Sequence, residues 1–378
     1  MTVFLAMLRD AYRELNSKKL FWAILVLSAM FVLVYASMGF DDRGVFMFFG
    51  LWHIENDVLV KGSPMAALLY RGIFSTFVVP IWLAWVATIL ALISTASVFP
   101  DFIAGGSIDV VLSKPIGRVR LFFYKYIASL LFVLLQVTLF CAGVFLCMGW
   151  RLADWDWKIF LAIPIVVAFY SYLFSVCTLI GVWTRSALAA LLLTLLLWFG
   201  LYAINQTEII LNLVSTEVAV QMDDHEQRIT ELKTRRDELR GQENDENEAA
   251  LARVETELGN IQKEHGDVER MLGKLTPWRG GVRTIQVILP KTSETIALLD
   301  RALKRETDVN LMDLFTGNVS RDSSGGFMST DTSRDRRVRQ RLEDEYTARS
   351  LWYVLGTSLL FEAVVLALAC WIFVRRDY

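Results

Sequence analysis

The chain has 378 residues, 54% of them hydrophobic, and a formal net charge of −2 at pH 7. This composition is typical of a membrane protein rather than of a soluble domain, and the nearly balanced charge gives no indication of a nucleic-acid partner. The four cysteines all fall in apolar runs, and three histidines are too few for a His-rich site. Neither a disulfide framework nor a metal site is therefore predicted.

Six apolar stretches are each long enough to cross a hydrocarbon core of about 30 Å, which takes roughly 20 helical residues. We predict membrane-spanning helices at residues 20–39, 73–98, 121–148, 159–183, 187–205 and 351–374. No cleavage site of small residues follows the first stretch, so we expect it to remain as an anchor. An amphipathic segment, FLAMLRDAYRELNSKKLF, precedes it.

The orientation in the membrane follows from Lys and Arg beside the span ends, because these residues favour the cytoplasmic side. Basic residues such as Arg13, Lys114 and Arg376 stand before the first span, after the second and after the sixth, whereas the intervening short loops are mostly acidic. We therefore expect both termini in the cytoplasm and the long stretch 206–350 outside. The basic run RDRRVRQR (334–341) lies on that outer side, and long loops translocate largely regardless of charge.

Residues 206–350 form one polar insert, so we expect the membrane domain in two parts, 1–205 and 351–378. Apolar residues alternate at spacings of three and four over about 214–276, with Glu, Lys, Arg and Gln between them, which is the pattern of a coiled-coil seam. The charged run GQENDENE interrupts the pattern, so we predict an antiparallel helical hairpin that ends at Pro277. A strand (VRTIQVILP) and a helix (KTSETIALLDRALKR) are expected next. The hairpin is either a stalk or a platform for an external partner.

No motif indicates catalysis: the chain has neither a G-x-x-x-x-G-K-[ST] loop nor H-E-x-x-H, and we expect no catalytic residue in it. One residue stands out, Glu362 in the middle of the sixth predicted span. A carboxylate at that depth costs at least ~2.5 kcal/mol unless it is paired, protonated or wet, which makes it a hypothesis for an intramembrane pathway. The alternative is a protonated Glu362 that bonds to a neighbouring helix through Gln136 or through a Ser or Thr.

The cytoplasmic link between the second and third spans, about 101–116, holds more structure than a connector requires. Ser107 can cap a short helix, and Asp109 lies in its first turn, where a negative charge suits the helix dipole. Pro115 prevents the helix from continuing past Lys114. Its apolar face consists of Ile108, Val111 and Leu112. The helix is too short to bury that face by itself, so it needs a partner or the lipid surface.

The sequence GSIDVVLSKPIGRVRLFFYKY resembles the segment after the second span in permease subunits of the ABC type-2 exporter family. The matching residues are Gly106, Ser107, Ile108, Asp109, Leu112, Ser113, Lys114, Pro115, Ile116, Arg118 and Lys125. The resemblance covers roughly 1–205 and 351–378, and the six predicted spans and the amphipathic amino-terminal segment agree with it. It implies an all-α polytopic membrane protein in which 101–116 is a coupling helix. It also implies an ATPase-coupling set of Gly106, Ser107, Ile108, Asp109, Val111, Leu112, Lys114, Pro115 and Arg118.

The same resemblance implies a non-catalytic subunit in a bacterial cytoplasmic (inner) membrane. A separate ABC ATPase would bind ATP and Mg²⁺, and a second copy of the permease would complete a homodimer that moves a substrate outward. The external insert departs from the family, because it is much longer than the small helical elements usual there. We therefore keep an alternative open: an ABC-type mechanotransmission or envelope-scaffold protein that acts on an external partner through the hairpin and transports nothing.

Overall fold

The computed structural model describes most of the chain, and almost all of what it describes is helical. The described residues are 19–55, 59–104, 117–152, 155–241, 245–303, 334, 336–338, 340–342 and 351–376. The predicted amino-terminal helix (1–18) and most of the predicted coupling helix (105–116) lie outside these ranges.

The chain divides into two compact units, each described separately below. The first, called the bundle unit, comprises Met1–Leu201, Pro290–Ser324 and Val354–Tyr378. The second, called the hairpin unit, comprises Tyr202–Leu289 and Gly325–Tyr353.

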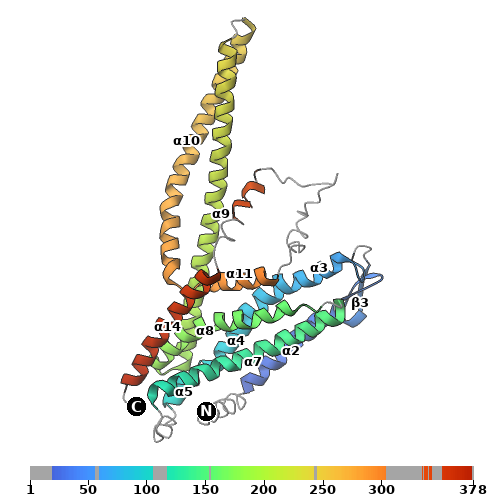
Figure 1. Ribbon diagram of the computed structural model, residues 1–378, viewed down its shortest axis with the longest axis vertical. Coiled ribbons are helices and arrows are strands. Elements are labelled where there is room, and N and C mark those ends of the chain that lie inside the picture. The colour runs from blue at the N-terminus through green and yellow to red at the C-terminus, as the bar shows by residue number, and fades with distance from the viewer. Residues whose placement is uncertain are drawn as a thin grey trace. The chain divides into compact units, whose positions relative to one another are not determined.

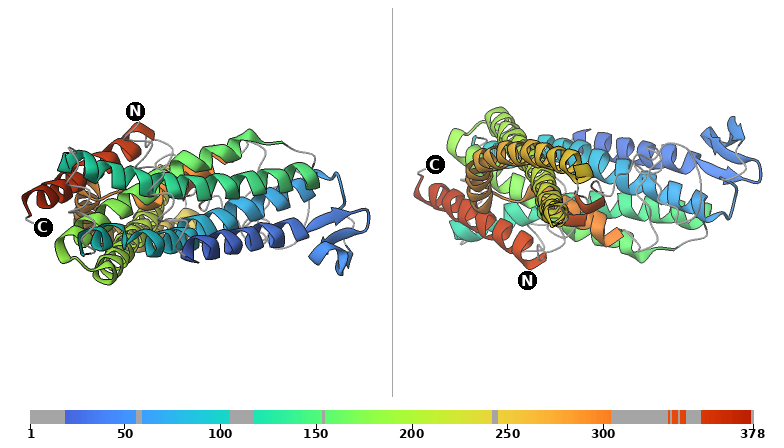
Figure 2. Two further views of the ribbon diagram at one scale, coloured as in Figure 1. Left: turned by 90° about the horizontal axis from the view of Figure 1, so that it is seen from below. Right: turned by 90° about the horizontal axis from the view of Figure 1, so that it is seen from above.

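The bundle unit is built from apolar helices. They are α2 (Lys19–Ser37), α3 (Pro64–Ile73), the π-helix η2 (Phe74–Ala87), α4 (Thr88–Thr95), α5 (Val98–Ala104), α7 (Arg118–Leu152), the 3₁₀-helix η3 (Trp157–Leu161), α8 (Ala162–Thr184), the first part of α9 (Ala187–Arg240), α11 (Thr292–Leu303) and α14 (Leu351–Arg375). In Figures 1 and 2, α2, α4 and α7 run side by side, and α7 also packs against α8.

Five helical segments in the described residues are long and apolar enough to cross a membrane. They are Ile81–Ile103, Arg118–Leu152, Trp157–Thr184, Ala187–Arg240 and Trp352–Arg375. The first predicted span forms helix α2, which holds a shorter apolar run, Trp22–Ser37. These lengths and compositions are those of a membrane-embedded, mainly α-helical protein.

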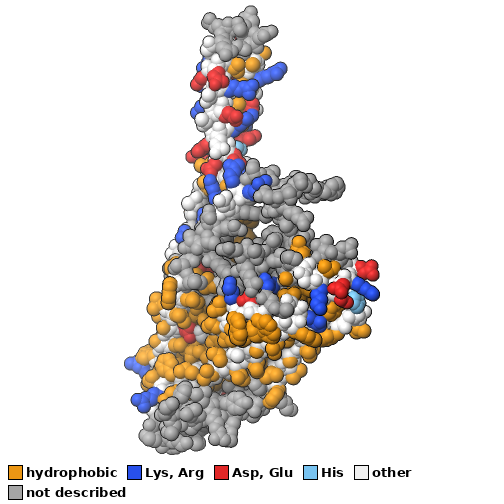
Figure 3. Space-filling view, turned by 45° about the vertical axis from the view of Figure 1, so that its right-hand side comes forward, with side chains coloured by type: hydrophobic (Ala, Val, Ile, Leu, Met, Phe, Trp, Pro, Cys, Tyr) orange, Lys and Arg blue, Asp and Glu red, His pale blue; other side chains and the backbone are white. Residues whose placement is uncertain are grey.

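The outer surface of the bundle unit supports the same conclusion. Figure 3 shows hydrophobic side chains over its visible face, and large apolar residues are exposed on α9 and α14, such as Leu196 at 66% and Leu360 at 67%. An exposed apolar surface of this extent is stable only against lipid or another protein.

A small antiparallel sheet joins α2 to α3, and the sequence did not predict it. Its strands are β1 (Gly39–Asp41), β2 (Gly44–Met47) and β3 (Trp52–Glu55), in the order β1-β2-β3. Strands of three and four residues are too short to show a clear alternation of apolar and polar residues. Arg151 at the end of α7 holds this end of the bundle, because its guanidinium donates to the Ala36 carbonyl of α2 (Nη2–O 2.6 Å) and lies over the Phe46 ring.

The hairpin unit consists mainly of the polar part of α9 and of α10 (Asp245–Ile288), which lie antiparallel. Residue numbers fall along α9 as they rise along α10 in successive contacts: Arg240–Glu255, Arg228–Glu257, Glu226–His265, Asn212–Arg279 and Glu208–Gln286. Leu232, Val254 and Leu258 form a small buried cluster between the two helices. Figure 3 shows Lys, Arg, Asp and Glu side chains scattered over the visible face of this unit.

Two sequence expectations about the second arm are wrong. The helix does not end at Pro277, and VRTIQVILP is not a strand, because α10 continues through Pro277 to Ile288. A proline in a helix interior removes one backbone hydrogen bond. Contacts beyond it, from Arg279 to Asn212 and from Gln286 to Glu208, continue the pairing with α9.

The predicted helix after the second arm is present as α11, but it groups with the bundle unit. Its buried residues Thr292, Thr295 and Leu298 are at most 4% exposed, and the helix packs against α8. The stretch 206–350 therefore contributes to both units.

Candidate functional site

The carboxyl group of Glu362 lies inside the bundle unit, where three helices meet. Glu362 on α14 is only 8% exposed. The Tyr126 hydroxyl on α7 donates to Glu362 Oε1 (2.8 Å), and the Ser171 hydroxyl on α8 donates to Glu362 Oε2 (2.8 Å). Each carboxyl oxygen thus has a hydroxyl partner from a different helix.

The two hydroxyl groups do not depend on the carboxyl for an acceptor. Tyr126 Oη also lies 3.1 Å from the Ser171 carbonyl oxygen, and Ser171 Oγ lies 2.8 Å from the Ala168 carbonyl oxygen. A neutral Glu362 could donate its own proton to Ser171 Oγ while both hydroxyls donate to backbone carbonyls. An ionised Glu362 could instead accept from both hydroxyls. The cluster therefore offers a full set of partners to either protonation state.

Further polar groups extend the cluster toward α11. Ser358 lies one turn before Glu362 on α14, and its hydroxyl oxygen accepts from the Lys291 backbone N–H (3.0 Å). The Tyr172 hydroxyl on α8 lies near Thr295 and Ser358 and is buried without a hydrogen bond to any described residue. These side chains form a buried polar track from α11 to Glu362 in a unit whose core is otherwise mainly apolar and aromatic.

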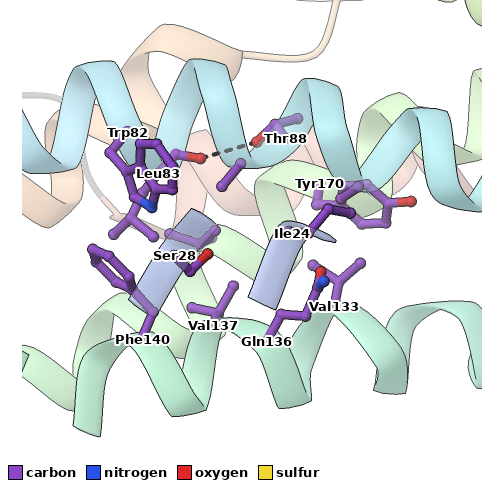
Figure 4. A pocket seen from close by; sticks show the side chains of 13 residues that line it. Ile24, Ser28, Trp82, Leu83, Thr88, Val133, Gln136, Val137, Phe140 and Tyr170 are labelled. Atoms are coloured by element: carbon purple, nitrogen blue, oxygen red, sulfur yellow. Dashed lines mark hydrogen bonds between the residues drawn. The ribbon is translucent and has the colours of Figure 1, made fainter. Parts of the chain in front are cut away.

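The sequence indicates Glu362 as a candidate, but it indicates only part of the surroundings of this residue. A Ser partner from a neighbouring helix was one of the expected arrangements, and Ser171 fills that role. Tyr126 was not anticipated, because nothing in a single apolar helix indicates which of its faces meets another helix. Gln136 is not part of this site: it lines a separate cavity, shown in Figure 4, whose lining does not include Glu362.

Arg118 joins α7, the helix that follows the predicted coupling segment, to α14. This residue begins α7, and its Nη1 donates to the carbonyl oxygens of Val374 (3.1 Å) and Arg376 (3.0 Å) at the end of α14. Arg376 in turn donates from Nη1 to the carbonyl oxygens of Val182 and Trp183 at the end of α8 (2.8 and 2.9 Å). Both arginines satisfy carbonyls that a helix end leaves without intrahelical partners.

Aromatic packing holds α5, the helix that precedes the segment. Phe99 on α5 lies 5.1 Å from Phe122 on α7 between ring centroids, and Phe122 lies 5.7 Å from Phe373 on α14. Phe102 is 4% exposed, and the Lys125 ammonium lies 5.0 Å from the centre of its ring. The helices α5 and α7, which flank 105–116, are thus both packed into the core.

Only Arg118 of the predicted ATPase-coupling set is described. The others, which lie outside the described residues, are Gly106, Ser107, Ile108, Asp109, Val111, Leu112, Lys114 and Pro115.

The described residues contain no group of three or more His, Cys, Asp or Glu side chains that could hold a metal ion. Comparisons with family models, with curated proteins and with solved structures found no match to this chain. The functional conclusion therefore depends on the residues themselves and on their arrangement.

Proposed function

We propose that the chain is the membrane-spanning permease subunit of an ATP-driven ABC exporter. A separate ATPase subunit would hydrolyse ATP and dock on the segment 105–116, and this chain would convert the resulting movement into outward transport. It would work as a homodimer in a bacterial inner membrane, with both termini in the cytoplasm, and would bind no nucleotide itself.

One observation carries this proposal: the two helices that flank the docking segment, α5 and α7, are both packed into the core of the bundle. Phe102 and its neighbours hold α5, and Arg118 joins the start of α7 to the end of α14. A passive connector between two spans needs neither attachment. A force applied to 105–116 would reach α5, α7 and α14 together, because a packed core transmits displacement rather than absorbing it.

The buried carboxyl lies on the same three helices that the arginines join. Arg118 and Arg376 connect α7, α14 and α8 at their ends, and Glu362 connects them again within the bundle through Tyr126 and Ser171. Movement of α7 against α14 would stretch the Tyr126–Glu362 hydrogen bond. Glu362 would therefore change its hydrogen-bond partners during the transport cycle.

A second candidate, mechanotransmission to an external partner, is favoured by the continuity of α9. This single helix of 54 residues begins in the apolar part of the chain and ends in the charged arm paired with α10. At 1.5 Å per residue it is about 80 Å long. A helix without a break is suited to carrying movement from spans to an external partner.

Site-specific photo-crosslinking tests the docking proposal in cells. A photoreactive amino acid at position 108 should give an adduct with a protein that contains a P-loop motif, identified by mass spectrometry. The matched control replaces Leu139, which is 51% exposed on α7 and faces away from the core. Adducts with the same P-loop protein from both positions, or from neither, would reject docking at 105–116.

A further inference from the structure

A group of large apolar side chains is exposed at one end of the bundle unit, where α2 and α7 finish. They come from the segment that joins β2 to β3, which contains the 3₁₀-helix η1 (Phe48–Gly50), and from α7 and η3. In Figures 1 and 2 the strands lie at the end of the bundle away from α5. Each side chain is more than half exposed, and Leu51 reaches 90%. The group, called the apolar rim, consists of Phe48, Phe49, Leu51, Trp52, Trp150 and Trp157.

Arg151 joins the two parts of the apolar rim on a rigid support. Its guanidinium carbon lies 5.8 Å from the centre of the Phe49 ring and 4.4 Å from the centre of the Trp150 ring. The same guanidinium donates to a carbonyl oxygen at the end of α2. Trp157 packs on Phe145 of α7, with 4.9 Å between ring centroids. The apolar rim is therefore one surface held by α2 and α7.

The backbone at the centre of the apolar rim is strained. Phe48 and Phe49 have φ angles of 51° and 58°, in the left-handed region that bulky residues rarely adopt. Strain of this kind is concentrated at functional sites, because the surrounding structure must hold it in place. Neither ring becomes buried in return, since both are more than half exposed. The packing of the chain itself therefore gives no reason for this conformation.

The register of the sheet separates apolar from charged residues. Met47 pairs with Trp52, so η1 lies at the end of the sheet that contacts α2. Gly44 pairs with Asp41 and with Glu55, so the turn Asp41–Gly44 lies at the opposite end, about 10 Å away along β2. That end carries the exposed charged residues Asp41, Asp42, Arg43 and Glu55. An apolar end beside the spans and a charged end away from them suit a membrane surface, where hydrocarbon gives way to water.

The apolar rim also continues the lipid-facing surface of the bundle. Leu139, Leu146 and Trp150 are exposed on α7 at spacings of seven and four residues, which places them on one face of the helix. The 19 residues of α2 are about 28 Å long, which is close to the ~30 Å of a hydrocarbon core. The rim begins just past the end of α2, at the depth of the headgroups. Tryptophan is enriched at that depth, because its ring is amphipathic.

We propose that the apolar rim is a membrane-surface anchor, which inserts among the headgroups and upper acyl chains of one leaflet and fixes the depth of this end of the bundle. Its partner is the phospholipid surface, and the charged turn Asp41–Gly44 stays in water. The anchor depends on neither an ATPase nor a transported substrate, so it can fail while the function proposed above holds.

Depth-dependent fluorescence quenching of the full-length chain in nanodiscs tests the anchor. Leu51→Cys carries a nitrobenzoxadiazole label, and the unsubstituted chain measures background labelling of its four buried cysteines. The phosphatidylcholine of the nanodisc bears a nitroxide either on the headgroup or in the middle of an acyl chain. The headgroup nitroxide should remove most of the fluorescence at position 51, and the acyl-chain nitroxide should remove less.

Two further label positions calibrate the depth. Leu360, exposed near the middle of α14, should show the reverse order of quenching, and neither lipid should quench a label at Asp42. A label at position 51 that aqueous iodide quenches and neither lipid quenches lies in water. A label that neither the lipids nor iodide can reach is covered by protein, such as a second copy of this chain. Either of these two results overturns the proposal.

Matched substitutions test whether the apolar rim sets this depth. Phe49→Asp places a charge in the rim without added backbone strain, because Asp tolerates the left-handed conformation. It should reduce headgroup quenching of the label at position 51. Arg43→Asp introduces the same residue on the charged turn and should leave that quenching unchanged. Equal quenching in the two variants would show that the spans alone set the depth, which would overturn the anchoring role.

Discussion

The Tyr126 hydroxyl on α7 lies 2.8 Å from Glu362 Oε1 on α14, and the same hydroxyl lies 3.1 Å from the Ser171 carbonyl oxygen on α8. One proton donor is thus within reach of acceptors on two different helices. The bundle can shift this donor from one acceptor to the other without leaving a buried hydroxyl unpaired. That property distinguishes the Glu362 site from a hydrogen bond that only fastens two helices together.

The Glu362 cluster predicts an asymmetry between its members. Glu362→Leu should change the free energy of unfolding by less than about 1 kcal/mol, because Tyr126 and Ser171 retain backbone acceptors. Tyr126→Phe should cost about 1 kcal/mol, since it removes a donor from the buried carboxyl. Denaturant unfolding of the purified chain in detergent measures both. A Glu362→Leu variant that loses more than Tyr126→Phe would make the carboxyl a structural requirement.

We predict that Arg118 keeps the last turn of α14 folded. Gln is shorter than Arg and carries no charge, so Arg118→Gln should weaken the hydrogen bonds to Val374 and Arg376 and accelerate amide exchange in the last turn of α14. Arg120→Gln is the matched control, because Arg120 is exposed on the same turn of α7. Equal exchange in the two variants, measured by mass spectrometry, would contradict the role assigned to Arg118.

Reciprocal hydrogen bonds join α2 and α3. Each of the buried tyrosines Tyr35 and Tyr70 donates its hydroxyl to the backbone carbonyl of the other (3.1 Å in both cases). Tyr35→Phe and Tyr70→Phe should each lower the free energy of unfolding by about 1 kcal/mol, since the carbonyl partner stays buried. Thermal melting of the two variants checks this. If neither substitution changes the melting temperature, the two hydrogen bonds make no net contribution to stability.

The hairpin unit should depend on its apolar contacts and very little on its surface ion pairs. Leu258 is 7% exposed between α9 and α10, so Leu258→Ala should cost about 2–5 kcal/mol. Arg228 pairs with Glu257 and Glu231 on the surface, where solvent screens the charges, so Arg228→Gln should leave the free energy of unfolding nearly unchanged. Thermal unfolding, followed by the loss of the helical circular dichroism signal, compares the two variants. An equal loss of stability in both would contradict apolar packing between α9 and α10.

The apolar helices of the bundle were predictable because about 20 uninterrupted apolar residues carry a strong signal. The antiparallel order of α9 and α10 also agrees with the regular spacing of residues such as Leu232 and Leu258. Pro277 predicts the end of the second arm, because proline usually terminates a helix, but α10 continues beyond it and stays paired with α9. Tertiary contacts there outweigh the local cost.

The sequence indicated only part of the candidate site. Glu362 stands out because a carboxylate is rare in an apolar run, whereas Tyr126 and Ser171 are ordinary residues of such helices. Their convergence depends on how α7, α8 and α14 rotate against one another, which is set by packing and not by sequence spacing. Gln136 was expected near Glu362 for its polarity alone, and it lines a different cavity.

The central claim is that 105–116 docks an ATPase whose movement the bundle receives. The most direct measurement is affinity co-purification of the detergent-solubilised chain, with ATP hydrolysis assayed in the eluate. The comparison is between the wild type and a variant with Ile108, Asp109 and Leu112 all changed to Arg. We predict that a P-loop ATPase co-purifies with the wild type and is lost from an equally well folded variant. An eluate without ATPase from the wild type, or equal ATPase from both, would contradict the account.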